Sequence, residues 1–364
     1  MAATDFWRRL GAFLGGLLAV GGARAVDLPG DSAEAMFHSY SGGGVTANGP
    51  ALLVRKSVMD KVSLSASYYV DAVSNASIDV VTTASPYKER RNEYSLGADY
   101  VYRDSQITFG LNRSKEPDYT ANRYSLDIAQ ETFGGMTSVS LGFTRGSDEV
   151  GKHYSPEFAD MATHWQYRVG VTQILTPRWI ASANFEAISD DGYLGSPYRI
   201  ARVFGAAVPE RNPRTRSSRA MKFRVNGDLG SHDAMHVEYR YFWDNWAIKA
   251  HTLEGGYSRY FGDRWLADAS LRYYRQGHAL FYSDNAQAET TYVSRNRQLS
   301  TFDSIGLGGK LSYTWRKEPG KYEVKLNGSY EFVRFKYSDF TDIRTGSAYG
   351  FNANVLQLYV SATF

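Results

Sequence analysis

Apolar and polar side chains alternate along most of this 364-residue chain. In one clear segment, Tyr94, Leu96, Ala98, Tyr100 and Tyr102 alternate with Ser95, Gly97, Asp99 and Val101. Successive side chains of a strand point to opposite faces, so this period of two predicts a strand with one apolar and one mostly polar face. Segments of this kind recur from Met36 to the C terminus and predict an all-β protein.

The connections between these segments are alternately short and long. Short connections with the Gly, Pro and Asp residues of tight turns are expected at 59–61, 103–105, 133–135, 176–178, 230–233, 262–264 and 318–320. Longer ones are expected at 74–91, 146–162, 190–216, 277–303 and 336–350. Tight turns at one end and long loops at the other are typical of transmembrane, antiparallel, up-and-down β-barrels, with the turns on the periplasmic side.

The segments indicate about sixteen strands, the first two near residues 37–46 and 50–58. Fourteen or eighteen strands are also consistent with the pattern. Each of these numbers is even, so the N and C termini of the mature chain are both expected on the periplasmic side.

The last strand ends on an aromatic residue. Leu356, Leu358, Val360 and Ala362 alternate with Gln357, Tyr359, Ser361 and Thr363, and Phe364 follows. This ending resembles the closing strand of bacterial outer-membrane β-barrels, in which a terminal Phe is part of the assembly signal. The resemblance implies that Phe364 lies on the periplasmic side and is recognised by the barrel-assembly machinery.

The first 25 residues have the features of a secretory signal peptide. Arg8 and Arg9 precede an apolar stretch at 10–20, and Ala23-Arg24-Ala25 forms a cleavage site. The stretch of about a dozen residues is shorter than the ~20 that a membrane-spanning helix needs, and no later stretch approaches that length. The sequence predicts a signal peptide at 1–25, a periplasmic lead at 26–35 and a barrel at 36–364.

The aromatic content supports a barrel in the membrane. The chain has 27 Tyr, 19 Phe and 7 Trp, and Trp179, Trp265 and Trp315 lie beside predicted periplasmic turns. Tyr and Trp are favoured at membrane interfaces because their rings are apolar and their tips polar. A soluble β-sandwich would instead place them in the middle of its strands. We therefore expect a protein that contacts lipid in the outer membrane of a Gram-negative bacterium.

Charged residues of both signs lie on the polar face of the predicted strands. The predicted lumen-lining residues are Arg168, Lys222, Arg224, Glu238, Arg240, Asp268, Arg272, Lys310 and Lys325. They could pair across the lumen and hold the wall, or some of them could line a path for a solute. Because the signs are mixed, they do not predict ion selectivity.

The predicted loop at 190–216 is rich in arginine. Arg199, Arg202, Arg211 and Arg214 surround an apolar run at 201–208. Folded inward, this loop would narrow the pore and attract anions. Folded outward, it would be an ordinary surface loop.

Signals for catalysis and cofactors are weak. The chain has no Cys, which excludes disulfides and thiolate metal sites, and its net charge of +3 argues against nucleic-acid binding. The seven His are scattered, and no GxSxG, HExxH, P-loop or EF-hand motif is present. We expect neither an enzyme nor a cofactor-binding protein. A barrel enzyme remains an alternative for which no Ser–His pair can be chosen.

The segment from 41 to 94 carries a more specific resemblance. Its motifs are Gly42-Gly43-Gly44-Val45, Gly49-Pro50, Val54-Arg55-Lys56, Tyr68-Tyr69-Val70-Asp71, Ala76-Ser77-Ile78-Asp79-Val80 and Ala84-Ser85-Pro86-Tyr87. They resemble an uncharacterised family of proteobacterial outer-membrane proteins, a domain of unknown function. The resemblance implies a barrel and supplies no substrate. Such proteins are often encoded near periplasmic flavin-transferase and thioredoxin-like proteins, which implies a redox partner as one possibility.

Two functions follow as expectations. The first is a porin-like channel that passes a solute or an exported factor. The alternative is a structural sheath or docking barrel for a periplasmic or extracellular electron-transfer partner. The chain lacks a CxxCH motif and cannot attach c-type haem itself.

Overall fold

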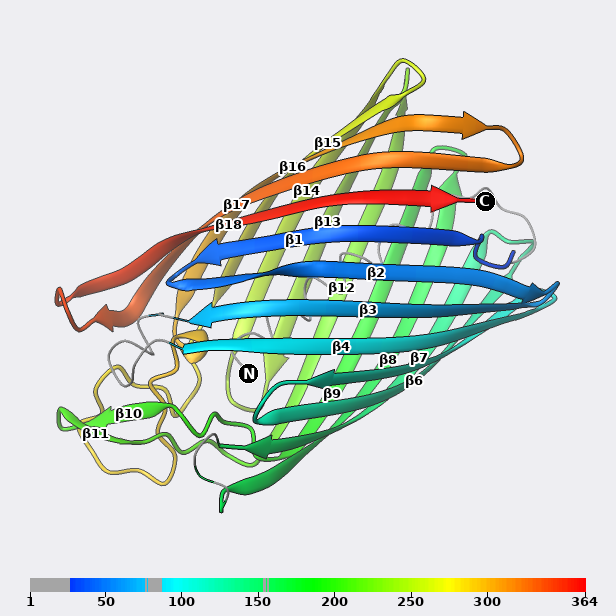
Figure 1. Cartoon of the computed structure of the whole chain (residues 1–364). Helices are drawn as coiled ribbons and strands as arrows, with labels where there is room; N and C mark the ends of the chain where they lie inside the picture. Colours follow the sequence, from blue (N-terminus) through cyan, green and yellow to red (C-terminus); the bar gives the residue numbers. More distant parts are fainter. Residues whose placement is uncertain (1–26, 76, 78–86, 153–154, 156) are drawn as a thin grey trace.

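The chain forms a closed antiparallel β-barrel, described in a computed structural model for residues 27–75, 77, 87–152, 155 and 157–364 (Figure 1). The predicted signal peptide lies outside the described residues. The wall strands are β1 (Ser32–Gly42), β2 (Val45–Met59), β3 (Val62–Asn75), β4 (Tyr87–Tyr102), β5 (Ser105–Lys115), β6 (Tyr119–Thr132), β7 (Thr137–Gly151), β8 (Ala159–Thr176), β9 (Trp179–Gly192), β12 (Thr215–Gly230), β13 (Asp233–Asp244), β14 (Lys249–Phe261), β15 (Trp265–Gln276), β16 (Phe302–Glu318), β17 (Tyr322–Asp342) and β18 (Ser347–Thr363). The prediction of a sixteen-stranded up-and-down barrel is confirmed.

Two further strands and one short helix lie outside the wall. Strands β10 (Ile200–Val203) and β11 (Ala206–Pro209) form a hairpin in the connection from β9 to β12, and the 3-10 helix η1 (Arg297–Leu299) lies in the connection from β15 to β16. Within the described residues, no helix is long and apolar enough to cross a membrane.

Each wall strand pairs with its neighbours in the chain, and β1 pairs with β18 to close the barrel. All seven predicted tight turns lie at the end that also holds Asp27 and the C terminus. By the membrane topology of such barrels this end is periplasmic, and the opposite end, with the longer loops, is the outer end.

Three predicted connections differ from the structure. The first hairpin turns at Gly43 and Gly44, not near residues 47–49, because these glycines adopt left-handed φ values of 59° and 79°. The predicted loops at 146–162 and 336–350 shrink to 152–158 and 343–346, since the flanking strands continue beyond the apolar belt. The first strand begins at Ser32, so residues 32–35 of the predicted lead belong to the wall.

The outward face of the wall is an apolar belt. Leu271 and Leu307, on adjacent strands, are 58% and 61% exposed, and the side chains next to them in each strand turn inward. Large apolar side chains are stable in this position only against hydrocarbon. The aromatic residues Trp265 and Trp315 lie outward near the periplasmic turns, as expected for an interface girdle.

At the periplasmic end, the N-terminal and C-terminal segments of the barrel are hydrogen-bonded to each other. The N–H of Phe364 donates to the carbonyl oxygen of Asp31 at 3.0 Å, and the Asp31 carboxylate binds the Lys56 ammonium. The Lys56 side chain and the Ser57 N–H hold the pKa of Asp31 at about 2. Of the neighbouring pair Arg55 and Lys56, the first faces inward to Asp99 and the second outward, as the alternation predicts.

The seam between β1 and β18 is packed most tightly at Gly42. A Cβ atom added there would lie 2.4 Å from the Cβ atom of Ala353, its register partner on β18. We expect Gly42→Val to strain the seam and to lower the free energy of unfolding by about 1–3 kcal/mol, the usual cost of overpacking. Urea unfolding, together with the mobility shift of the unheated barrel on gels, measures this.

Gly277→Ala is the matched control for the seam variant. A Cβ atom at Gly277 has no heavy atom within 4 Å, and its backbone has no left-handed φ. We expect this variant to unfold like the natural protein. Equal stability of both variants would show that the seam tolerates a side chain.

Candidate functional site

Charged side chains of the interior wall form ion pairs between strands that are adjacent or separated by one strand. On β12 and β13, the Glu238 carboxylate lies 3.4 Å from the Lys222 ammonium and 3.6 Å from the Arg224 guanidinium. Two residues further along β13, on the same face, Arg240 reaches Glu186 of β9 at 3.5 Å. All five alternate with outward apolar residues, so these charges line the interior.

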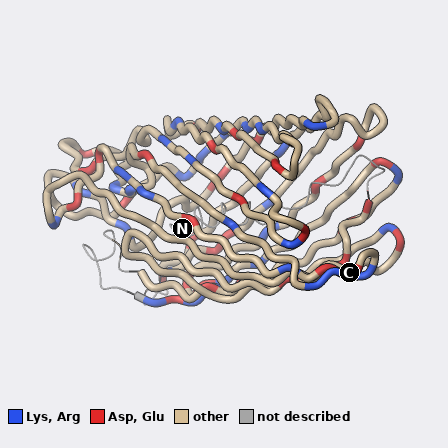
Figure 2. The backbone as a smooth tube through the Cα atoms, turned by 90° about the horizontal axis from the view of Figure 1, so that it is seen from above, with Lys and Arg blue, Asp and Glu red and all other residues tan. Residues whose placement is uncertain are grey.

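The other predicted lumen residues lie on the same inward face. Arg168 binds Asp127 at 2.6 Å, and Lys325 binds Glu323 at 3.0 Å. The remaining three have separate neighbours: Ser258 donates to Asp268, Glu254 is the register partner of Arg272, and the ring of Tyr359 lies 5.8 Å from the Lys310 ammonium. Figure 2 shows charged residues of both signs along the strands and at both barrel ends.

A buried cluster near the outer end of β1, β3 and β4 was missed by sequence reasoning. The His38 Nε2 atom lies 2.7 Å from one oxygen of Asp71, and the Arg91 guanidinium lies 2.7 Å from the other oxygen. The His38 ring stacks on Tyr69 with centroids 4.4 Å apart. Alternation assigns each residue to the interior face, but only the strand register brings them together.

A second missed cluster surrounds His164 on β8. Its Nδ1 lies 2.7 Å from Asp190 and its Nε2 lies 2.9 Å from Asp148, which also accepts a hydrogen bond from Tyr119. Because both ring nitrogens contact carboxylates, this histidine is not placed to act as a base toward a serine hydroxyl. The cluster joins strands and gives no catalytic geometry.

Two loops at the outer end pack on each other, and we call residues 193–214 and 277–301 together the mouth layer. Residues 277–301 lean over the interior side of the wall, where Tyr282 and Leu299 pack with inward-facing Tyr274, Phe302 and Tyr337. Further members of this apolar core are Trp246, Ile248, Ala250, Ala279, Phe340 and Tyr349. The segment that lies against interior side chains is therefore 277–301, which the sequence had not singled out.

Arg295 fastens the mouth layer to the β17–β18 hairpin. Its buried guanidinium donates to the carbonyl oxygens of Asp284 at 3.0 Å and Thr341 at 2.6 Å, and it lies 4.3 Å from the ring centroid of Phe340. Nearby, the Arg297 guanidinium lies 5.3 Å from the ring of Phe351. Planar guanidinium groups suit such combined hydrogen bonding and stacking.

The β10–β11 hairpin lies at the outer end of the barrel (Figure 1), where it packs on residues 277–301. Val203 forms a β-bridge with Ala286, and Arg211 forms one with Val293. The two loops of the mouth layer therefore support each other through backbone pairing.

The structure gives the four predicted constriction arginines separate surroundings. The Arg214 guanidinium makes a two-pronged contact with Asp160 at 2.7 and 2.8 Å, and Arg211 donates to the carbonyl oxygen of Thr290 at 2.9 Å. Arg199 and Arg202 accept backbone hydrogen bonds at their carbonyl oxygens, from Glu210 and Ala286. That the loop at 190–216 narrows the pore stays a prediction.

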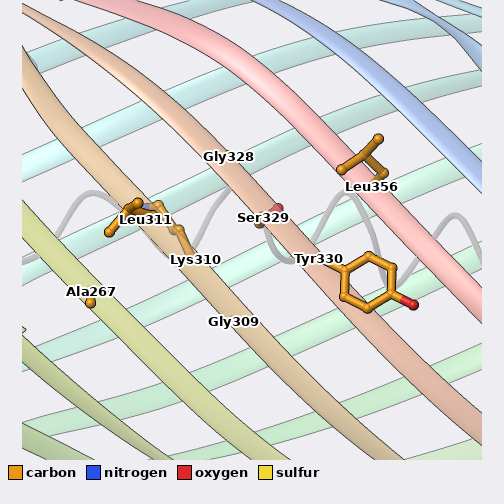
Figure 3. Close-up of a pocket in the computed structure, with 8 residues that line it drawn as sticks. All are labelled: Ala267, Gly309, Lys310, Leu311, Gly328, Ser329, Tyr330 and Leu356. Carbon is orange, nitrogen blue, oxygen red and sulfur yellow. The ribbon is translucent and has the colours of Figure 1, made fainter.

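An acidic cluster and a shallow depression also lie near the wall. Ligand atoms of Glu89, Glu116 and Asp118 lie within 4.8 Å of one another at the outer end, and burial raises the pKa of the Glu116 carboxyl. Such acidic groups are common without an ion. On the lipid-facing side, a depression of about 390 Å³ lies over strands β15 to β18 (Figure 3), lined outward by Ala267, Gly309, Leu311, Gly328, Tyr330 and Leu356.

A closed barrel with an apolar outer belt and a charged interior defines an outer-membrane β-barrel protein. The chain belongs to the family described as "Protein of unknown function (DUF3570)", whose model matches residues 32–330. The predicted resemblance to an uncharacterised family is thus confirmed. A search of curated proteins found no match.

The chain is similar to several solved structures of low sequence identity. The siderophore receptor PirA from Pseudomonas aeruginosa has 11% identity and a TM-score of 0.47, with 87% of this chain and 60% of that chain covered. The loop L8 deletion mutant of OmpT, an outer membrane protein of Vibrio cholerae, has 8% identity and a TM-score of 0.48, with 91% and 97% covered. The CymD monoaromatic hydrocarbon channel has 11% identity and a TM-score of 0.44, with 92% and 88% covered. The chain thus spans about 60% of the length of the siderophore receptor.

Arg295→Lys should loosen the mouth layer, because a single ammonium cannot replace the fork that reaches both Asp284 and Thr341. We expect backbone hydrogens of residues 279–299 to exchange roughly 10- to 100-fold faster, the effect of losing about 1.5–3 kcal/mol of charged hydrogen bonding. Hydrogen exchange followed by mass spectrometry on the folded barrel measures this.

Arg199→Lys serves as the control in the same layer, since no side-chain hydrogen bond of Arg199 is found among the described residues. Its exchange should match that of the natural protein. Unchanged exchange in Arg295→Lys would show that the apolar core alone holds the loop.

Proposed function

We propose that this barrel is an outer-membrane channel for small polar solutes, with an outer entrance narrowed by the mouth layer. The observation that carries the proposal is the interior wall, where ion pairs run from the periplasmic end to the middle of the strands, and on β3, β4, β7 and β8 on toward the outer end. A barrel that only anchored a protein in the membrane would not need so many ion pairs in its interior. Barrels of sixteen to eighteen strands are wide enough for an aqueous channel.

The pairing of the wall charges suits passage of a solute. The Glu238 carboxylate lies beside two cations, and the Asp127 carboxylate lies beside one. Charges of opposite sign are therefore close together, and the electrostatic field in the interior is not strongly of one sign. Such a wall hydrates easily and holds no ion tightly. We therefore propose weak charge selectivity, with selection by size at the mouth.

The mouth layer supports a size limit. Its core of Tyr282, Leu299 and the surrounding aromatic residues is held by backbone bridges and by Arg295, so it forms a fixed cover more than a free loop. A fixed, partly apolar cover of this kind narrows the outer entrance and leaves the polar lumen open.

Planar-bilayer recording on the purified protein tests the channel directly. We expect stepwise conductance from the natural protein. We also expect a higher single-channel conductance when residues 280–298 are replaced by a short Gly-Ser linker, because the linker cannot form the aromatic core. A folded barrel without conductance in both forms would contradict the proposal and favour the sheath or docking function.

The wall charges provide a second test, through Glu238→Gln. This change leaves Lys222 and Arg224 without their carboxylate, so we expect the permeability ratio of chloride to potassium to rise about two- to fivefold, the effect of one unit charge in a water-filled lumen. The reversal potential in a KCl gradient measures it.

Glu318→Gln removes the same charge at a periplasmic turn, where Glu318 pairs with Lys321 away from the lumen. Its permeability ratio should stay at the natural value. A shift as large as that of Glu238→Gln would mean that net charge, and not the lumen wall, sets selectivity.

A further inference from the structure

Three basic side chains stand on the outward face just beyond the apolar belt. Arg275 follows Tyr273 on β15, and Arg334 and Lys336 follow Phe332 on β17. All three are exposed and share the face of the lipid-exposed aromatic residues. They therefore stand where the hydrocarbon ends and lipid headgroups begin.

The strand register brings these cations into one patch. Arg275 pairs with Asp303 of β16, and Asp303 pairs in turn with Lys336, while Arg334 is the partner of Ile305. Register partners have Cα atoms about 4.5–5.5 Å apart, so Arg275 and Lys336 stand about 10 Å apart across Asp303. Three cations against one carboxylate leave the patch positive.

The patch differs from the interior wall in its pairing. Among the described residues, no side-chain hydrogen bond or ion pair occupies Arg275, Arg334 or Lys336, whereas Arg168 and Arg240 in the interior are paired. Unpaired cations of this length can extend their charged ends to an anion at the membrane surface.

The depression drawn in Figure 3 lies on the periplasmic side of the patch along strands β15 to β17. Gly328 precedes Arg334 by six positions on β17, about 20 Å along the strand and about 14 Å in depth at a tilt near 45°. Half of a hydrocarbon core is about 15 Å thick, the reach of one leaflet's acyl chains. Basic patch and depression thus have the spacing of a headgroup and the end of its acyl chain.

We infer that Arg275, Arg334 and Lys336 bind the phosphate groups of a phosphorylated outer-leaflet glycolipid, with an acyl chain running along the wall to the depression at Gly309 and Gly328. Guanidinium groups form paired hydrogen bonds with phosphate oxygens, and an ammonium adds charge. The side chains of Tyr330 and Leu356 would flank the acyl chain at the depression.

Lipid A with two phosphates, titrated into the full-length protein in neutral detergent and followed by native mass spectrometry, tests this inference. The variant combines Arg275→Gln, Arg334→Gln and Lys336→Gln, all at exposed positions. Each basic side chain near an anionic lipid surface is worth about fivefold in affinity, so we expect about hundredfold weaker binding from the triple variant. Lipid A without phosphates should bind the natural protein as weakly as phosphorylated lipid A binds the triple variant.

The control variant combines Lys61→Gln, Arg178→Gln and Arg264→Gln, three basic residues at periplasmic turns. It makes the same change in net charge at the opposite rim and should keep the natural affinity. Folding of every variant is checked by the mobility of the unheated barrel on gels. Phosphatidylglycerol, a phosphate lipid without sugar, should bind more weakly than lipid A.

Three results would overturn the inference: a triple variant that binds lipid A within twofold of the natural protein, equal binding of phosphorylated and dephosphorylated lipid A, or an equal loss in the control variant. Equal affinity for phosphatidylglycerol would overturn the assignment to the glycolipid.

Discussion

Backbone hydrogen bonding in a medium without water is the constraint on which this structure depends. In hydrocarbon every unpaired N–H and C=O is costly, so a sheet can cross the membrane only when its first and last strands meet. Here β1 and β18 pair from Ser32 with Thr363 to Gly42 with Ala353. Gly42 allows the close approach at the outer end of this seam, and closure then divides all wall side chains into an outward and an inward set.

That division explains why the same charged residue types behave differently on the two faces. Inward cations meet carboxylates across the wall: Lys222 binds Glu238 on the adjacent strand, and Arg168 reaches Asp127 past one intervening strand. The outward cations Arg275, Arg334 and Lys336 stand where the apolar belt ends, and no carboxylate of the described residues binds them. The inward set suits a hydrated path, and the outward set suits contact with lipid headgroups.

The mouth layer adds an apolar core outside the membrane. Strands β17 and β18 extend past the belt, and their inward aromatic residues pack against residues 277–301 instead of facing lipid or open water. Arg295 and the bridges to the β10–β11 hairpin then hold two long loops as one unit. A barrel with charged residues along its interior wall thus carries ordered loops at its outer end.

The sequence by itself determined the barrel, an even number of strands near sixteen and its tight turns, because period-two alternation and turn residues such as Gly262 and Pro319 act over a few neighbouring positions. It also assigned Arg168 and Lys310 to the polar face. Only the tertiary structure decided which residues meet across strands: the register joins His38, Asp71 and Arg91, which alternation alone leaves unconnected. It likewise showed that residues 277–301 cover the interior, since their apolar side chains find partners on strands distant in the chain.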